Sequence, residues 1–214
     1  MQRRKKVLLW LAAACGLVCG AFSAAQADVL EKPVIYLYPE TDAHVYVVLD
    51  VNGAIFKSAP AYGTGWHVFV TKKGTIDNAY DYLFYEAVFD QPPVLVPGSW
   101  VVKTEDLQPW LDENLLKFGL SILEAQAFKE YWLNRLTAAP YYEIGLVDRT
   151  FLDENATLVI MPRPRTVIRL MFYFIPLQEA RPFVAPVVAP PPAREGFTVV
   201  EWGGIVSEAP ERAR

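Results

Sequence analysis

The stretch GFTVVEWGG, residues 196–204, decides how the fold of this chain is interpreted. As a strand, it places Phe197, Val199 and Glu201 on one face and Thr198, Val200 and Trp202 on the other. Neither face is polar, so a free tail of this composition would expose a segment prone to aggregation. We therefore expect residues 196–204 to form a strand of the main domain, followed by a disordered tail over residues 205–214.

The segment before this strand is rich in proline. Residues 176–195 carry six prolines and few side chains that could order them, so we expect an extended, polyproline-like conformation. We call this segment the proline strap. If residues 196–204 belong to the main sheet, the strap must run along the surface and return the chain to it.

Strand-like segments dominate the rest of the chain. HVYVVLDVNGAIF (44–56) alternates apolar and polar residues and then reaches Asn52-Gly53, the strongest short signal for a tight hairpin. WHVFVTKKGTID (66–77) repeats this pattern with Lys73-Gly74 as its turn. Further strand-like runs are VIYLY (34–38), YDYLFYEAVF (80–89), SWVV (99–102), YEIGLV (142–147), TLVIM (157–161) and TVIRLMFYF (166–174).

One region is helical. Thr104 is a suitable N-cap for a first helix that ends before Gly119, and Ser121 and Glu124 have the spacing of a capping box for a second. We expect a helical hairpin over about residues 104–137. The predicted fold is mainly β, of α+β type: one β-rich domain over residues 28–175, with a β-sandwich-like antiparallel core of eight or nine strands and a two-helix insertion. The C-terminal strand is returned to this core by the proline strap.

The beginning of the chain predicts export. A basic start is followed by an apolar run and by Ala25-Gln26-Ala27, which is typical of a secretory signal peptide over residues 1–27, cleaved after Ala27. A retained membrane anchor is the alternative. Cys15 and Cys19, the two cysteines of the chain, lie in this segment, so we expect a cysteine-free mature protein in the periplasm or outside the cell, with no membrane span.

The charge of the chain excludes one class of partner. Removal of residues 1–27 leaves 16 basic and 24 acidic residues, which changes the formal net charge from -4 to -8. An acidic surface without a basic tract repels phosphate backbones, so we expect no nucleic-acid partner.

Five blocks occur in a fixed order along the sequence. They are KPVIYLYPE (32–40), YDYLFYE (80–86), GL with a following YWL (119–133), PRPRTVIR (162–169) and GFTVVEWGG (196–204). Together they resemble a family of small exported bacterial proteins to which no biochemical function is assigned. The resemblance covers roughly Lys32 to Gly204 and implies export and a single domain, but no catalytic residues. Two positions differ from the family pattern: Tyr85 replaces a tryptophan and Arg165 replaces an acidic residue.

Most catalytic templates are missing from the sequence. It has no G-x-S-x-G or H-E-x-x-H motif, no phosphate-binding loop and no dinucleotide-binding fingerprint. His44 and His67, its two histidines, alternate with aromatic residues on strands, and we interpret them as partly exposed sheet residues. Their spacing with the carboxylates does not support a metal site. We therefore predict no metal and no cofactor.

Charged residues on apolar strand faces are the remaining candidates. Glu86 shares a face with Tyr82 and Phe84, and Glu201 shares one with Phe197 and Val199. Two such carboxylates among rings could act as the acid and base of a glycosidase, with Tyr82 and Trp202 as binding aromatics.

A structural role for the same carboxylates is the competing interpretation. Arg169 also lies on an apolar face, and an arginine is well suited to a buried carboxylate, here Glu86 or Glu201. Lys32 could serve a second acid, so Arg169 and Lys32 are candidates for ion pairs or for ligand binding.

Three functions stay open at this point. The first is an exported binding module without catalytic activity that recognises a glycan or a protein of the cell envelope. The second is a carbohydrate-active hydrolase that uses Glu86 and Glu201. The third is a structural surface protein.

Overall fold

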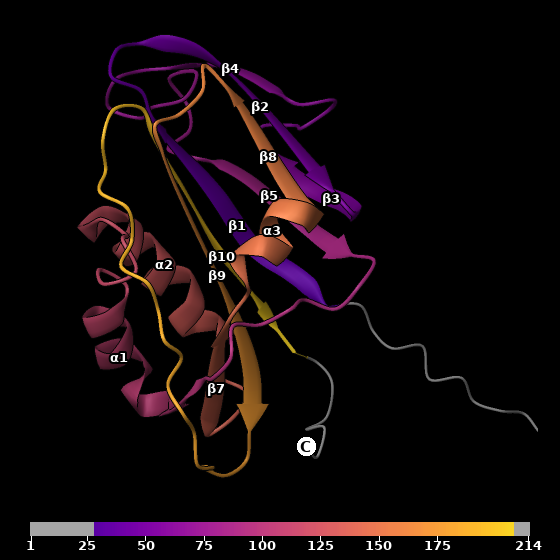
Figure 1. Cartoon of the computed structure of the whole chain (residues 1–214), viewed down its shortest axis with the longest axis vertical. Coiled ribbons are helices and arrows are strands. Elements are labelled where there is room, and N and C mark those ends of the chain that lie inside the picture. The colour runs from indigo at the N-terminus through magenta and orange to yellow at the C-terminus, as the bar shows by residue number, and fades with distance from the viewer. Residues whose placement is uncertain (1–27, 208–214) are drawn as a thin grey trace, which may run out of the picture.

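A computed structural model describes residues 28–207 of the chain, and these residues form three layers. A seven-stranded sheet lies in the middle, a three-stranded sheet covers one of its faces, and two helices cover the other (Figure 1). The expected mainly β fold of α+β type is confirmed. The expected signal peptide and most of the expected tail lie outside the described residues.

The large sheet contains strands from both halves of the chain. Its strand order is β3-β5-β1-β10-β9-β7-β6. The bounds are β1 Val29–Tyr38, β3 Gly53–Ala59, β5 Leu83–Phe89, β6 Trp100–Lys103, β7 Tyr141–Leu146, β9 Thr166–Leu177 and β10 Thr198–Val206.

The small sheet has the order β4-β2-β8, with β2 at Ala43–Val51, β4 at Trp66–Val70 and β8 at Ala156–Met161. The predicted hairpin at Asn52-Gly53 is wrong, because β2 and β3 lie in different sheets. The two residues form a corner: the backbone N–H of Asn52 donates to the carbonyl of Asn155, and β3 continues by pairing with β5. The turn at Lys73-Gly74 is confirmed, with the N–H of Gly74 bonded to the carbonyl of Thr71.

The C-terminal strand β10 is the central strand of the large sheet. It pairs antiparallel with β1 and parallel with β9. The parallel pairing arises because the proline strap crosses from the end of β9 to the start of β10 over the helical side of the molecule (Figure 1). All nine residues of β10 are buried, since layers cover both faces of the sheet. The strand also includes residues 205 and 206, which we expected in the tail, and β9 includes residues 176 and 177, which we expected in the strap.

The helical layer is the predicted hairpin, formed by α1 (Leu107–Asn114) and α2 (Ile122–Arg135). The first helix begins later than the expected cap at Thr104, because a 3-10 turn occupies Thr104–Asp106. The capping box at the start of α2 is confirmed: the N–H of Glu124 donates to Ser121 Oγ, and the N–H of Ser121 donates to Glu124 Oε2. No helix within the described residues is long and apolar enough to cross a membrane.

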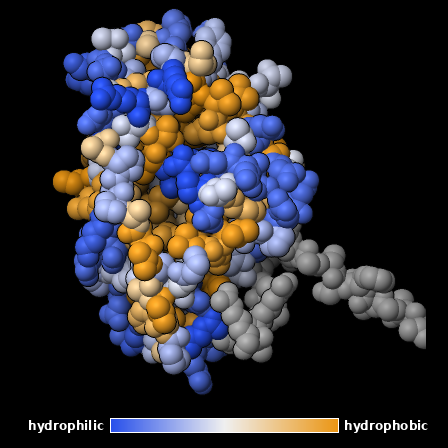
Figure 2. Space-filling view, viewed as in Figure 1, coloured by the Kyte–Doolittle hydropathy of each residue, from blue (hydrophilic) through white to orange (hydrophobic). Residues whose placement is uncertain are grey.

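A third helix, α3 (Arg149–Asn155), was not predicted. Asp148 caps it by accepting hydrogen bonds from the N–H groups of Thr150 and Phe151. It contributes Phe151 and Leu152 to the core between the two sheets. The space-filling view shows hydrophobic residues interspersed among hydrophilic ones on this side of the molecule (Figure 2).

Two adjacent glycines of β10 allow the layers to approach. A Cβ atom on Gly203 would lie 2.8 Å from the backbone of Pro33, and one on Gly204 would lie 2.7 Å from the Trp132 ring. Three of the sequence blocks that carry the family resemblance, KPVIYLYPE, YWL and GFTVVEWGG, therefore meet at this glycine pair.

Candidate functional site

The first candidate site is built around a β-bulge in β1. The register of β1 with both of its neighbours shifts between residues 30 and 34. Lys32 lies in this bulge with a positive φ of 53°, a conformation that costs free energy for any residue with a side chain. Bulges redirect side chains, and this one directs Lys32 toward the helical side of the sheet, beside Tyr82 and Tyr131.

Lys32 Nζ lies against aromatic rings from two elements. It is 4.9 Å from the ring centres of Tyr82, the residue before β5, and of Phe84 on β5, and 5.9 Å from that of Tyr131 on α2. It also donates a hydrogen bond of 3.0 Å to the Tyr82 hydroxyl. Each close cation–π contact contributes about 0.5–2 kcal/mol, depending on how far it is desolvated. The rings therefore hold the ammonium in place, and among the described residues its one hydrogen bond is the one to Tyr82.

The carboxylate of Glu31 lies beside Tyr131. Arg135 binds Glu31 through two hydrogen bonds of 2.7 Å, and the Tyr131 hydroxyl donates to the same carboxylate. Burial, followed by the charge of Glu31, raises the pKa of Tyr131 to about 12, so its hydroxyl is a stable donor at neutral pH.

Glu86 lies on the same face of β5 as Phe84 and pairs with Lys57 at 3.1 Å. We call the half-buried group Lys32, Tyr82, Phe84, Glu86 and Tyr131 the Lys32 shelf. It joins three rings, a cation and a carboxylate, contributed by β1, by β5 with the residue before it, and by α2.

A second polar group lies on the opposite face of the large sheet. Arg169 on β9 and Glu201 on β10 are register partners, and Arg169 Nε donates to Glu201 Oε2. Their side chains are 1% and 0% exposed, respectively. The Tyr85 hydroxyl donates to Glu201 Oε1 at 2.7 Å. Burial, reinforced by the charge of Glu201, raises the pKa of Tyr85 well above its ordinary value.

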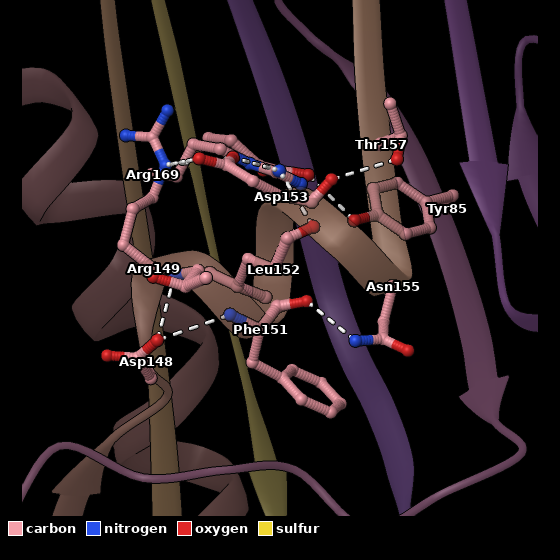
Figure 3. A network of polar contacts seen from close by, with 11 residues as sticks. Tyr85, Asp148, Arg149, Phe151, Leu152, Asp153, Asn155, Thr157 and Arg169 are labelled. Atoms are coloured by element: carbon pink, nitrogen blue, oxygen red, sulfur yellow. Dashed lines mark hydrogen bonds and ion pairs between the residues drawn. The ribbon is translucent and has the colours of Figure 1, made fainter.

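This buried network reaches the surface at α3 (Figure 3). Arg169 Nη1 donates to the carbonyl oxygen of Leu152 and to Asp153 Oδ1, both at 3.1 Å, and Arg149 pairs with Asp153. Burial opposes the charge on Arg169, but the adjacent Glu201 outweighs it and raises the pKa of the guanidinium. Arg169 therefore stays charged, and Glu201 has no exposed surface at which a substrate could reach it.

The structure does not bring Glu86 and Glu201 together. Successive residues of a strand face opposite ways, and Glu201 contacts Tyr85, the neighbour of Glu86 in β5. Glu86 thus lies on the helical side of the sheet and Glu201 on the side of the small sheet. A pair of carboxylates acting on one glycosidic bond would have to lie on the same side.

The two expected binding aromatics have different surroundings. Tyr82 is half-buried on the Lys32 shelf. Trp202 is completely buried under α2, with its ring 5.2 Å from that of Phe128, so no part of it is available to a ligand.

Sequence reasoning missed Tyr131, Arg135 and Glu31 as parts of this site. Their only signal is the YWL block, which places a tyrosine on α2 next to the buried Trp132.

Comparison with known proteins gives one informative relative. The chain is 44% identical over 78 residues to a protein of Butyrivibrio fibrisolvens described as "Uncharacterized protein in bglA 3'region", a match that covers 33% of this chain and 81% of the relative. No protein-family model matches the chain, and no solved structure matches it significantly. Because the match covers most of the relative at this identity, the chain belongs to the same family as that uncharacterized protein of Butyrivibrio fibrisolvens.

Proposed function

We propose that the protein is an exported, non-catalytic binding module that recognises a carbohydrate of the cell envelope on the Lys32 shelf. The observation that carries this proposal is the position of Lys32, which is held in a strained backbone conformation over three rings. Strained residues cluster at ligand-binding sites, where the surrounding structure maintains them.

The chemistry of the shelf supports a carbohydrate. Half-buried rings offer flat apolar surfaces to the C–H faces of a sugar. A small number of charged groups beside these rings can form hydrogen bonds that orient the sugar hydroxyls. Lys32 supplies donors, and Glu86 supplies acceptors. The acidic character of the chain, by contrast, disfavours polyanions such as nucleic acids.

The separation of Glu86 from Glu201 supports binding rather than hydrolysis. Glu86 already pairs with Lys57, and Glu201 is enclosed by Arg169 and Tyr85. Neither carboxylate has a partner of the kind that glycoside hydrolysis requires.

The test is a carbohydrate-binding screen with the purified protein, followed by calorimetric titration of the polysaccharide that binds. Tyr82→Ala and Lys32→Gly should each weaken binding about tenfold or more, the usual effect of losing a central aromatic or cationic contact. Glycine at position 32 removes the ammonium without adding backbone strain. Tyr46→Ala is the matched control, because Tyr46 is an exposed tyrosine of the small sheet, and it should bind like the unaltered protein.

Two results would contradict the proposal. One is unchanged binding after both shelf substitutions. The other is release of reducing sugar ends by the unaltered protein that Glu86→Gln abolishes, since this would make Glu86 catalytic.

A further inference from the structure

The outer face of the small sheet carries both histidines of the described residues. His44 on β2 lies opposite Phe69 on β4, and Tyr46 lies opposite His67. His44 and His67 are therefore diagonal neighbours on one face of an antiparallel pair, the geometry in which long side chains meet. Both are exposed, and the Lys32 shelf lies on a different sheet.

The two imidazoles are close enough to share one ion. Their ring centres are 5.5 Å apart, and the rings are tilted by 50°. A metal ion lies about 2.0–2.1 Å from each imidazole nitrogen, so two imidazoles at adjacent coordination positions have their ring centres roughly 5 Å apart. The observed separation of the ring centres is close to that value.

Neighbouring rings hold the histidines in place. The Tyr46 ring stacks on His67 at 3.9 Å with an interplanar angle of 10°, and Phe69 meets His44 edge-on at 5.4 Å. These contacts restrict both side chains before an ion binds, which lowers the entropy that binding must overcome.

We propose that His44 and His67 form a binding site for a borderline divalent transition-metal ion, Cu²⁺ before Ni²⁺ and Zn²⁺. Imidazole suits these metals, and their affinities follow the Irving–Williams order. No group of three or more histidine, cysteine, aspartate or glutamate residues between positions 28 and 207 could hold a metal, so within this range the proposed site has two protein ligands. The remaining coordination positions are open to solvent or to a small ligand, and the ion is exchangeable.

The probe is the metal salt alone. Protein without an affinity tag is titrated calorimetrically with CuSO₄, NiCl₂, ZnCl₂ and MgCl₂, and the copper-loaded sample is examined by electron paramagnetic resonance. We expect one Cu²⁺ per chain with nitrogen hyperfine structure, weaker binding of Ni²⁺ and Zn²⁺, and no binding of Mg²⁺, which prefers oxygen ligands.

Variants of the two histidines, compared with a control variant on the same strand face, test whether these side chains bind the Cu²⁺. His44→Ala and His67→Ala should each weaken Cu²⁺ binding about tenfold or more, since each removes one of two protein ligands. Val48→Ala on the same exposed strand face should leave it unchanged. Exposed positions tolerate these changes, and unfolding midpoints measured without metal will show that the variants are folded. Absence of Cu²⁺ binding, or equal binding by the protein that lacks both histidines, would overturn the proposal.

Discussion

At the residue scale, the buried pair of Arg169 and Glu201 shows which contacts the alternation of residues along a strand can predict and which it cannot. The sequence placed both charges on apolar strand faces, and the structure makes them register partners in adjacent strands. The role of Tyr85 could not be predicted, because alternation along β5 does not show which layer its face contacts. Asp153 was missed because it belongs to α3, a short helix whose main sequence signal is the cap Asp148.

The first prediction concerns Glu201. Glu201→Gln removes the buried counter-charge of Arg169 and leaves it paired with the half-exposed Asp153 alone, so we expect the free energy of unfolding to fall by about 3–5 kcal/mol. Urea denaturation at neutral pH measures this loss. Glu86→Gln is the control: its partner Lys57 is 59% exposed, and the loss should stay below about 1 kcal/mol. Equal losses for the two variants would show that Glu201 is not buried in an ion pair.

The second prediction concerns Gly204. In Gly204→Ala, the added methyl group would lie 2.7 Å from the Trp132 ring and 2.9 Å from Phe174, so the sheet and α2 must separate. We expect a loss of about 1–3 kcal/mol in urea denaturation, as is usual for overpacking. Gly145→Ala in β7 is the control, because its nearest neighbour would be a side-chain carbon at 3.4 Å. A smaller loss at Gly204 than at Gly145 would contradict the close packing of β10 against α2.

At the scale of elements, the proline strap is held by ion pairs and isolated hydrogen bonds rather than by secondary structure. Arg194 binds both the buried carboxylate of Glu124 and the carbonyl oxygen of Gly119. The Tyr38 hydroxyl donates to the same carboxylate at 2.7 Å. One glutamate therefore joins the strap, the start of α2 and strand β1. The sequence predicted the strap and the capping box, but it could not predict this contact, which spans 70 residues.

The third prediction tests this attachment. Arg194→Ala should detach the end of the strap, lower the free energy of unfolding by about 1–2 kcal/mol and speed proteolytic cleavage within residues 178–195. Limited proteolysis followed by mass spectrometry locates the cuts. Arg165→Ala removes an exposed ion pair with Glu195 and should not change the cleavage rate. Protection of the strap in the Arg194 variant would rule out the proposed role of that pair.

The corner at Asn52-Gly53 shows why local signals can mislead. The dipeptide has the composition of a hairpin turn, but its strands diverge into two sheets. A Cβ atom on Gly53 would lie 2.0 Å from the carbonyl oxygen of Val88, so the glycine is needed for close approach to β5. The helical hairpin and the positions of most strands were local properties and were predicted well. Sheet membership depends on contacts between distant segments, which alternation within one segment does not reveal.

At the scale of the whole molecule, layers on both faces of the large sheet bury tyrosine hydroxyls beside carboxylates. Burial raises the pKa of Tyr36, Tyr38, Tyr85 and Tyr131, and nearby acidic groups add to the effect. In each case the folded protein retains the phenolic proton to a higher pH than the unfolded chain does.

The fourth prediction follows from this difference. The contribution of these tyrosines to stability is complete below about pH 10, the ordinary tyrosine pKa, and is lost as pH rises above it, because the unfolded chain ionises first. Urea denaturation should give a free energy of unfolding that falls steadily between about pH 9.5 and 11.5. The fall should be shallower in Tyr85→Phe, which has one such proton fewer. A free energy that is constant over this range would show that the hydroxyls are not buried.

The account as a whole depends on β10 being the middle strand of the large sheet, since this position creates the Arg169–Glu201 pair and brings the sequence blocks together. Hydrogen exchange followed by mass spectrometry tests this most directly. The amides of residues 199–205 should be among the slowest in the protein and should exchange only through global unfolding. Exchange of these amides at the rate of an unstructured peptide would contradict the account.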